Sequence, residues 1–169
     1  VGDHTRPTTD RNRESIFNIL AHKPDFAMAG ARVLDLFAGS GALGLEALSR
    51  GGSACVFVET GAAQRGTIRE NIHAFGVQGC ARILRRDATS LGSIGTMLPF
   101  DLILVDPPYG KGLGERALRA AAHGGWLKPD AIVVCEEAID SEFQMPDGYE
   151  QIDERRMGCS IFRFLRFSH

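Results

Sequence analysis

The sequence predicts an α/β fold in which a mostly parallel, open sheet is covered by helices on both faces. Short apolar runs alternate with helical segments from residue 32 to residue 135, and continuously apolar strands are typical of parallel sheets buried on both sides. The end of the chain differs, because residues 149–167 contain two strand-like runs around Met157-Gly158-Cys159, which indicates a hairpin. We therefore expect antiparallel strands to close the sheet at one edge.

The length of 169 residues fits one domain. We expect a single domain over residues 1–169, made of an N-terminal extended segment and helix (1–24), a βα core (32–135) and the terminal hairpin (149–167). Hydrophobic residues make up 44% of the chain and charged residues 24%. Such a composition is typical of a soluble globular protein that buries a core without metal or disulfides.

The composition disfavours several classes of protein. No apolar run reaches the ~18 residues of a membrane span, and the start of the chain shows no secretion signal. The first residue is Val1 rather than Met, so we expect further residues ahead of it. The four cysteines are scattered without a Cys-x-x-Cys pair, so we expect neither a zinc site nor disulfides. We therefore expect the protein in the reducing cytoplasm. We also expect a monomer. The net charge of −2 leaves nucleic-acid binding to local basic patches.

The first predicted helix covers residues 10–22. Thr9 or Asp10 can cap it, its apolar residues recur at helical spacing, and Pro24 ends it. The chain then alternates between strand and helix. Strands are expected at 32–36, 54–59, 81–84, 101–105 and 131–135, and helices at 42–49, 62–75 and around 114–123.

A glycine-rich loop, Phe37-Ala38-Gly39-Ser40-Gly41, follows the first strand. Gly39, Gly41 and Gly44 satisfy the Gly-x-Gly-x-x-Gly pattern of nucleotide-binding turns. Glycine lets the backbone turn sharply and approach a ligand closely. Taken alone, the pattern is also consistent with an ordinary strand-to-helix turn.

Carboxylates at the ends of three strands favour S-adenosyl-L-methionine as the cofactor. Asp35 precedes the glycines, where its charge would stabilise the cationic amino-acid end of this cofactor but not a pyrophosphate. Glu59 ends the second strand and can accept hydrogen bonds from both ribose hydroxyls, as it also would in an NAD site. Asp87 follows the third strand and either accepts from the adenine amino group or caps a turn.

The segment Asp106-Pro107-Pro108-Tyr109 directly follows the fourth strand. Two prolines make this loop rigid and remove backbone donors. Such a loop suits the methylation of an exocyclic amine on a nucleic-acid base. This amine is a poor nucleophile, because its lone pair is delocalised into the ring. The Asp106 carboxylate and the Pro107 carbonyl would accept its two N–H bonds and disperse the developing positive charge. Tyr109 would stack on the base. A stiff turn with a capping aspartate is the alternative interpretation.

These motifs share one edge of the predicted sheet. In open parallel sheets, ligands bind at the carboxyl ends of strands, where the strand order reverses. If the first and fourth strands are neighbours, the glycine loop faces the Asp-Pro-Pro-Tyr loop, and methyl donor and acceptor meet in one cleft. We expect direct in-line transfer accelerated by positioning. No metal is needed, and none of the histidines has matching ligand partners.

With these motifs the chain resembles the bacterial methyltransferase family that modifies guanine N2 in 16S ribosomal RNA, the RsmD type. The likeness extends over nearly the whole chain. It rests on Arg6-Pro7-Thr8-Thr9-Asp10-Arg11 with Arg13-Glu14 and Phe17, on residues 35–41, on Gly44 to Glu46, and on residues 106–109. The Arg-Pro-Thr segment narrows the choice, since the other motifs occur throughout amino-methyltransferases. Family members carry a Gly- and Arg-rich stretch ahead of that segment, which this sequence does not contain.

The resemblance implies a Rossmann-like fold with strand order 3-2-1-4-5-7-6 and catalysis by Asp106 to Tyr109. It also implies that S-adenosyl-L-methionine is bound by Asp35, the glycine loop, Glu59 and Asp87. The expected partner is small-subunit ribosomal RNA, free or in a partly assembled subunit.

Two groups of residues could contact the RNA. Arg6, Arg11 and Arg13 could bind phosphates and Thr8 could border the cleft, or all four belong to a capped helix with a solvated face. Basic residues of the terminal hairpin are explained equally well by phosphate contact and by surface solubility. They are Arg155, Arg156, Arg163 and Arg166.

Three other functions stay open at the level of sequence. A DNA adenine-N6 methyltransferase would use the same four-residue motif, although no inserted DNA-recognition domain is evident. An NAD-dependent oxidoreductase would use Gly39, Gly41 and Gly44, and cofactor titration would separate it from a methyltransferase. A catalytically silent RNA-binding module would retain RNA without transferring a methyl group.

Overall fold

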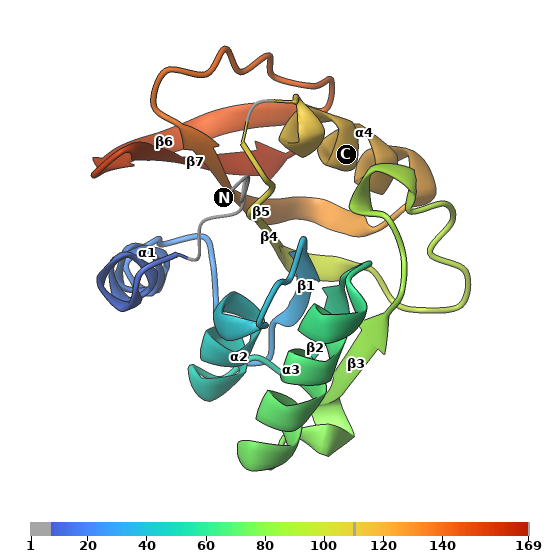
Figure 1. The fold of residues 1–169 in the computed structure, drawn as a ribbon. Helices are drawn as coiled ribbons and strands as arrows, with labels where there is room; N and C mark the ends of the chain where they lie inside the picture. Colours follow the sequence, from blue (N-terminus) through green and yellow to red (C-terminus); the bar gives the residue numbers. More distant parts are fainter. Residues whose placement is uncertain (1–7, 110, 169) are drawn as a thin grey trace.

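The computed structural model describes residues 8–109 and 111–168, which form one seven-stranded sheet with helices on both faces (Figure 1). The strands are β1 (Arg32–Leu36), β2 (Ala54–Val58), β3 (Ala81–Leu84), β4 (Phe100–Val105), β5 (Leu127–Ala138), β6 (Tyr149–Met157) and β7 (Ser160–Phe167). The helices are α1 (Asp10–Ala21), α2 (Ala42–Ser49), α3 (Ala62–Ala74) and α4 (Leu113–Gly124), with 3-10 turns η1 (Gln78–Cys80) and η2 (Ala88–Ser90).

The strand order is β3-β2-β1-β4-β5-β7-β6, as predicted. Strands β1 to β5 are parallel to one another, whereas β7 is antiparallel to both β5 and β6. Helix and strand bounds agree with the predicted ranges within two residues, except at β5. That strand begins at Leu127, and its pairing with β4 is irregular near Asp130, where φ is 67°. The polar run before residue 131 concealed this extension in the sequence.

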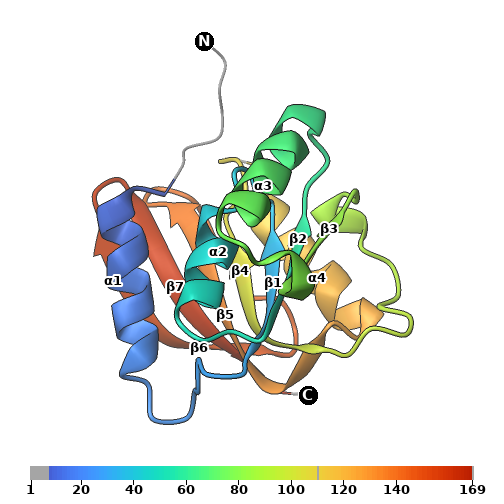
Figure 2. The same cartoon turned by 90° about the horizontal axis from the view of Figure 1, so that it is seen from below.

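Two apolar cores lie on opposite faces of the sheet, because successive strand residues point to alternate sides. One core packs α1, α2 and α3 against residues such as Val33, Phe57 and Phe164. The other packs α4, η2 and Trp126 against residues such as Leu34. Figure 2 shows α1 beside β7 and α2 over the central strands. Burial on both sides explains why the parallel strands are continuously apolar.

Helix α1 begins at Asp10 because the Thr9 hydroxyl accepts a hydrogen bond of 3.1 Å from the Asn12 amide. Its apolar side chains are almost fully buried, and burial of each contributes about 1.5–3 kcal/mol. They are Ile16, Phe17 and Leu20. Polar contacts to α2 add less, since each exposed ion pair is worth about 0.2–1 kcal/mol. Packing therefore fixes the helix, and the polar contacts define its register.

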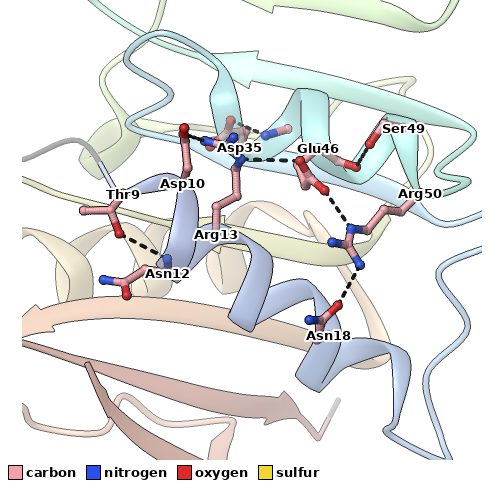
Figure 3. Close-up of polar contacts among 10 residues, drawn as sticks. Thr9, Asp10, Asn12, Arg13, Asn18, Asp35, Glu46, Ser49 and Arg50 are labelled. Atoms are coloured by element: carbon pink, nitrogen blue, oxygen red, sulfur yellow. Dashed lines mark hydrogen bonds and ion pairs between the residues drawn. The ribbon is translucent and has the colours of Figure 1, made fainter. Parts of the chain in front are cut away.

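Those polar contacts form a chain from α1 to α2 (Figure 3). Arg13 pairs with Asp10 at 3.0 Å and with Glu46 at 3.4 Å. Glu46 also pairs with Arg50 at 2.7 Å, and Arg50 reaches the Asn18 side chain at 3.2 Å. Helix α1 is thus attached to the helix that follows the glycine loop, and this attachment orients the residues just ahead of α1.

Candidate active site

The carboxyl ends of the four central strands lie at one edge of the sheet. Leu36 at the end of β1 pairs in register with Val58 of β2 and with Val105 of β4, and Val105 pairs with Cys135 of β5. The residues that follow these positions therefore emerge side by side. They are Phe37, Glu59, Asp106 and Glu136. The predicted adjacency of the first and fourth strands is confirmed.

The glycine loop turns tightly between β1 and α2. The Ala38 amide donates to the Val58 carbonyl at 3.1 Å, and the Gly41 amide donates to the Ala38 carbonyl at 2.8 Å. Gly41 has a φ of 83°, and a side chain there would also press on the Phe57 ring at 3.2 Å. Phe37 adopts a φ of 57°, which is strained for a bulky residue. Such strain is found at ligand-binding turns.

Gly44 lets α2 pack closely against the sheet. A Cβ atom there would lie 2.5 Å from the Phe57 ring, 2.7 Å from Cys55 Sγ and 3.0 Å from Asp35 Oδ2. The third glycine of the pattern is therefore needed for close packing. It also supplies the amide that donates to Asp35 Oδ2 at 3.0 Å.

Asp35 is the buried carboxylate at the end of β1, with a side chain only 1% exposed. Burial raises the pKa of Asp35 to about 8, since the charged form loses its water; the nearby Glu59 raises it further, and the Gly44 hydrogen bond partly offsets both. A cation bound beside Asp35 would favour its ionised form. The residue thus combines a structural tie to α2 with the charge expected of a cofactor site.

Glu59 connects the loops after β1 and β2. Its Oε1 accepts from the Gly39 amide at 2.8 Å, and its Oε2 accepts from the Gly61 amide at 2.9 Å. A carboxylate offers about four acceptor positions, so two remain for ligand hydroxyls. Glu59 can order both loops and still bind a ribose.

Asp87 follows β3 and caps η2. Its Oδ1 accepts from the Thr89 amide at 2.8 Å and from the Thr89 hydroxyl at 2.7 Å. These hydrogen bonds hold the pKa of Asp87 below its usual value. The capping interpretation of Asp87 is therefore confirmed, while a contact to adenine stays a prediction.

Asp106 and Glu136 form a pair of carboxylates bridged by Thr8. The Thr8 hydroxyl lies 3.1 Å from Asp106 Oδ2 and 3.0 Å from Glu136 Oε1. Burial, followed by the charge of Glu136, raises the pKa of Asp106 well above its usual range. Asp106 therefore binds a proton more readily than an ordinary aspartate does, and pKa shifts of this kind are common among acid–base residues of active sites.

Tyr109 is held in the same network. Its hydroxyl lies 2.7 Å from the Ser160 hydroxyl and donates to Glu136 Oε2 at 3.2 Å, while Ser160 also donates to Glu136 Oε2 at 2.7 Å. Pro107 is buried and Pro108 is partly exposed. The hydrogen bonds anchor the phenol end of Tyr109, and stacking of its ring on a base stays a prediction.

The predicted RNA-contacting residues have different surroundings. Arg6 lies outside the described residues. Arg13 is engaged with Asp10 and Glu46, which favours its structural interpretation. Arg11 is exposed at the start of α1 and lines a cavity of about 570 Å³ that also reaches Thr8.

Most arginines of the terminal hairpin pair with acidic neighbours. Arg155 pairs with Asp153, Arg163 with Glu154, and Arg166 with Asp25 and Glu150. Among residues 8–109 and 111–168, Arg156 has no such partner, and it lines the same cavity as Arg11. The basic cluster is therefore reduced to one arginine that is available to a phosphate.

Sequence reasoning missed Glu136 and Ser160. Glu136 follows the predicted fifth strand at the same position that Asp106 occupies after the fourth, so the strand-end rule that selected Asp35 and Asp106 also applies to it. Ser160 carried no sequence signal, because its position depends on the antiparallel pairing of Ala138 with Ser160.

The described residues contain no group of three or more His, Cys, Asp or Glu side chains that could hold a metal ion. The cysteines at positions 55, 80, 135 and 159 are free thiols. None of the helices in the described part of the chain is long and apolar enough to cross a membrane.

Comparison with known proteins agrees with this geometry. The model of the family described as conserved hypothetical protein 95 matches residues 1–166. Ribosomal RNA small subunit methyltransferase D of Escherichia coli K12 is 39% identical over 137 residues, which are 80% of this chain and 66% of that protein. The chain thus spans just under two thirds of this relative.

Solved structures share the fold. The Escherichia coli protein yhhF is 31% identical with a TM-score of 0.83, over 99% of this chain and 90% of that chain. An RNA methyltransferase from Salinibacter ruber, solved in complex with S-adenosyl-L-homocysteine, has a TM-score of 0.71 at 15% identity, over 96% of this chain and 94% of that chain. That likeness shows the fold alone.

The strand order, the glycine loop and the structural neighbours define the Rossmann-like fold of S-adenosylmethionine-dependent methyltransferases. The chain belongs to the family of conserved hypothetical protein 95, the RsmD-type family that its sequence resembles.

Proposed function

We propose that the protein transfers a methyl group from S-adenosyl-L-methionine to the exocyclic N2 amine of a guanine in small-subunit ribosomal RNA. One observation carries this proposal: the glycine loop and the Asp106 loop leave paired positions on β1 and β4, at Leu36 and Val105. A donor site and an acceptor site therefore share one edge. The name of the Escherichia coli relative supports ribosomal RNA as the substrate.

The residues at this edge fit the cofactor. The position of a Cβ at Gly39 meets no atom within 4 Å, so the loop is open on the side where a ligand would approach. Glu59 retains acceptor positions for ribose hydroxyls, and Asp35 retains Oδ1 for the cationic amino-acid end. When bound, the cofactor supplies an electrophilic methyl group on a sulfonium and leaves as a neutral thioether.

Asp106 and the Pro107 carbonyl act on the target amine. They accept its two N–H bonds and point the nitrogen lone pair toward the methyl group, which supplies positioning and stabilises the developing positive charge. As the new N–C bond forms, the nitrogen gives up one proton. Asp106 can take this proton, since burial and Glu136 raise its pKa.

The RNA is held by groups outside this centre. We propose that Arg11 and Arg156 contact phosphates, because both are exposed and line one cavity. Thr8 borders the cleft, because its hydroxyl lies within hydrogen-bond distance of both Asp106 and Glu136. We infer that the protein acts in the cytoplasm, where ribosomal RNA is made and assembled.

The test offers labelled S-adenosyl-L-methionine with unmodified small-subunit RNA, free and protein-bound, and maps the modified base. Asp106→Ala should lower transfer by at least about 1,000-fold while cofactor affinity changes little. Asp140→Ala, at an exposed aspartate beyond β5, is the matched control and should keep full transfer.

Other outcomes would replace the proposal. Methyl transfer to adenine in DNA would indicate a DNA methyltransferase, and tight binding of NAD in place of S-adenosyl-L-methionine would indicate an oxidoreductase. Retention of RNA with no labelled methyl transferred would indicate a silent RNA-binding module.

A further inference from the structure

A cavity of about 570 Å³ adjoins the carboxylate pair, between the start of α1 and the β6–β7 turn. Its inner wall is formed by Thr8, Glu136 and Ser160, of which Glu136 and Ser160 are each only 5% exposed. Its outer wall includes Arg11 and Arg156, which are exposed. The volume is in the range of small-ligand sites. Negative charge thus lies inside the cavity and positive charge at its mouth.

The hydrogen-bond network of Glu136, which extends from the cavity wall to Asp106 and Tyr109, contains more acceptors than donors. Each hydroxyl of Thr8, Tyr109 and Ser160 carries one hydrogen, and the Thr8 hydrogen can go to Asp106 or to Glu136 but not to both. Within residues 8–109 and 111–168, two hydroxyls contact Oε2 of Glu136, the Thr8 hydroxyl contacts Oε1, and the Asp106 carboxyl group lies beside Glu136. Each carboxylate oxygen offers about two acceptor positions. Oε1 therefore retains an acceptor position, and the pair of carboxylates suits a ligand edge that presents donors.

Guanine presents such an edge, because its N1–H and its N2 amine are adjacent donors. Adenine presents an amine next to the lone pair of N1, which would face a carboxylate unfavourably. Asp106 and Glu136 follow Val105 and Cys135, which are paired neighbours on β4 and β5. An amine held by Asp106 can therefore place its ring N1 on the side where Glu136 lies.

We propose that this cavity receives the target nucleotide and that Glu136 selects guanine by accepting its N1–H, while Arg11 and Arg156 bind the flanking phosphates. The inference rests on the proposed function and adds a specificity residue to it. A site built to bind a donor rejects analogues that lack the donor, because its buried acceptor is then left unpaired.

The test uses 2-aminopurine, which keeps the exocyclic amine of guanine but has a lone pair at N1. Small-subunit RNA is assembled with guanine or 2-aminopurine at the mapped target position. Wild-type protein should prefer guanine by about 100-fold in kcat/KM. Glu136→Gln should reduce this preference to less than about 10-fold, because a neutral amide can offer either its oxygen or its nitrogen.

Glu137→Gln is the matched control, since it makes the same chemical change at the next residue, whose side chain contacts Cys135 and Ser141 instead. Its preference for guanine should equal that of the wild type. An unchanged preference in Glu136→Gln would overturn the inference. Equal use of guanine and 2-aminopurine by the wild type would overturn it as well, and this measurement does not depend on whether any variant folds. Absence of transfer to any guanine by the wild type would instead contradict the proposed function.

Discussion

Asp106 and Glu136 follow a paired position on neighbouring parallel strands, and the Thr8 hydroxyl lies within 3.1 Å of an oxygen of each. The two carboxylates come from the core of the sheet, but the group that joins them comes from the segment ahead of α1. The protonation state of Asp106 therefore depends on burial, on Glu136 and on Thr8 together.

The first prediction concerns the pH dependence of methyl transfer. In the proposed reaction the ionised form of Asp106 accepts from the amine. Its pKa is raised, so activity should be lost as the pH falls through that raised pKa. Glu136→Gln removes the like charge, which lowers the pKa of Asp106. The acid limb of kcat/KM, measured from pH 5 to 9, should therefore move to lower pH by about one unit. A limb that stays in place would show that Glu136 does not influence Asp106.

The second prediction concerns Asp35, whose burial should lower the stability of the protein but whose charge should strengthen cofactor binding. The pKa of Asp35 in the folded protein is about 8, well above the ordinary aspartate value of 3.8. Its stabilising contribution is therefore complete below pH 3.8 and is lost as the pH rises to about 8. Asp35→Asn, which cannot ionise, should gain about 2–4 kcal/mol relative to wild type between pH 5 and pH 8.

Urea unfolding of the cofactor-free protein at several pH values measures this difference. The same variant should bind S-adenosyl-L-methionine at least about 10-fold more weakly, since one charge opposite the cofactor's ammonium is lost. A variant with a pH-independent stability difference and normal affinity would contradict both assignments.

The third prediction tests the packing role of Gly44. A methyl group there would collide with Phe57 and Cys55, so Gly44→Ala should lower the free energy of unfolding by about 1–3 kcal/mol. Gly66→Ala is the control within α3, where a Cβ would meet no atom within 4 Å. That substitution should stabilise the protein by about 0.5–1 kcal/mol, because alanine favours the helix. Equal effects in denaturant titrations would argue against the close contact.

The fourth prediction distinguishes two arginines of the terminal hairpin. Arg156→Ala should weaken binding to unmodified small-subunit RNA. It should also reduce the slope of log K against log salt concentration by about one, the change expected for the loss of one phosphate contact. Arg166→Ala should leave that slope unchanged, because Arg166 already pairs with Asp25 and Glu150. Filter binding over a range of salt concentrations measures both. Equal loss in the two variants would indicate a diffuse surface attraction rather than a site.

The fold was largely predictable, since its signals are local. The apolar runs and the glycines at helix starts predict most of the helix and strand bounds, and the position of the last turn predicts the terminal hairpin. The length of β5 was not predictable, because its last residues are strand only through pairing with β7, as at Glu136 and Phe162. Long-range pairing leaves no periodic pattern in the sequence of one strand.

The site was predictable where it follows the strand-end rule. The rule correctly predicts that Asp35, Glu59 and Asp106 share one edge of the sheet, and it also applies to Glu136; their roles toward ligands stay predictions. The remaining groups depend on tertiary contacts. Thr8 approaches Asp106 because α1 packs on the sheet, and Arg13 is engaged with Glu46 across two helices. Whether an arginine is paired or available cannot be inferred from its neighbours in sequence.

The position of β7 between β5 and β6 has a consequence for the newly made chain. During synthesis β6 emerges before β7, yet it has no sheet edge to join until β7 has paired with β5. Glu136 obtains its Ser160 donor at that same moment. A growing chain tethered to the ribosome would therefore expose the free edge of β5, and Glu136 would lack its Ser160 donor. If the proposed function holds, the acceptor site would therefore be complete only after β7 has paired with β5.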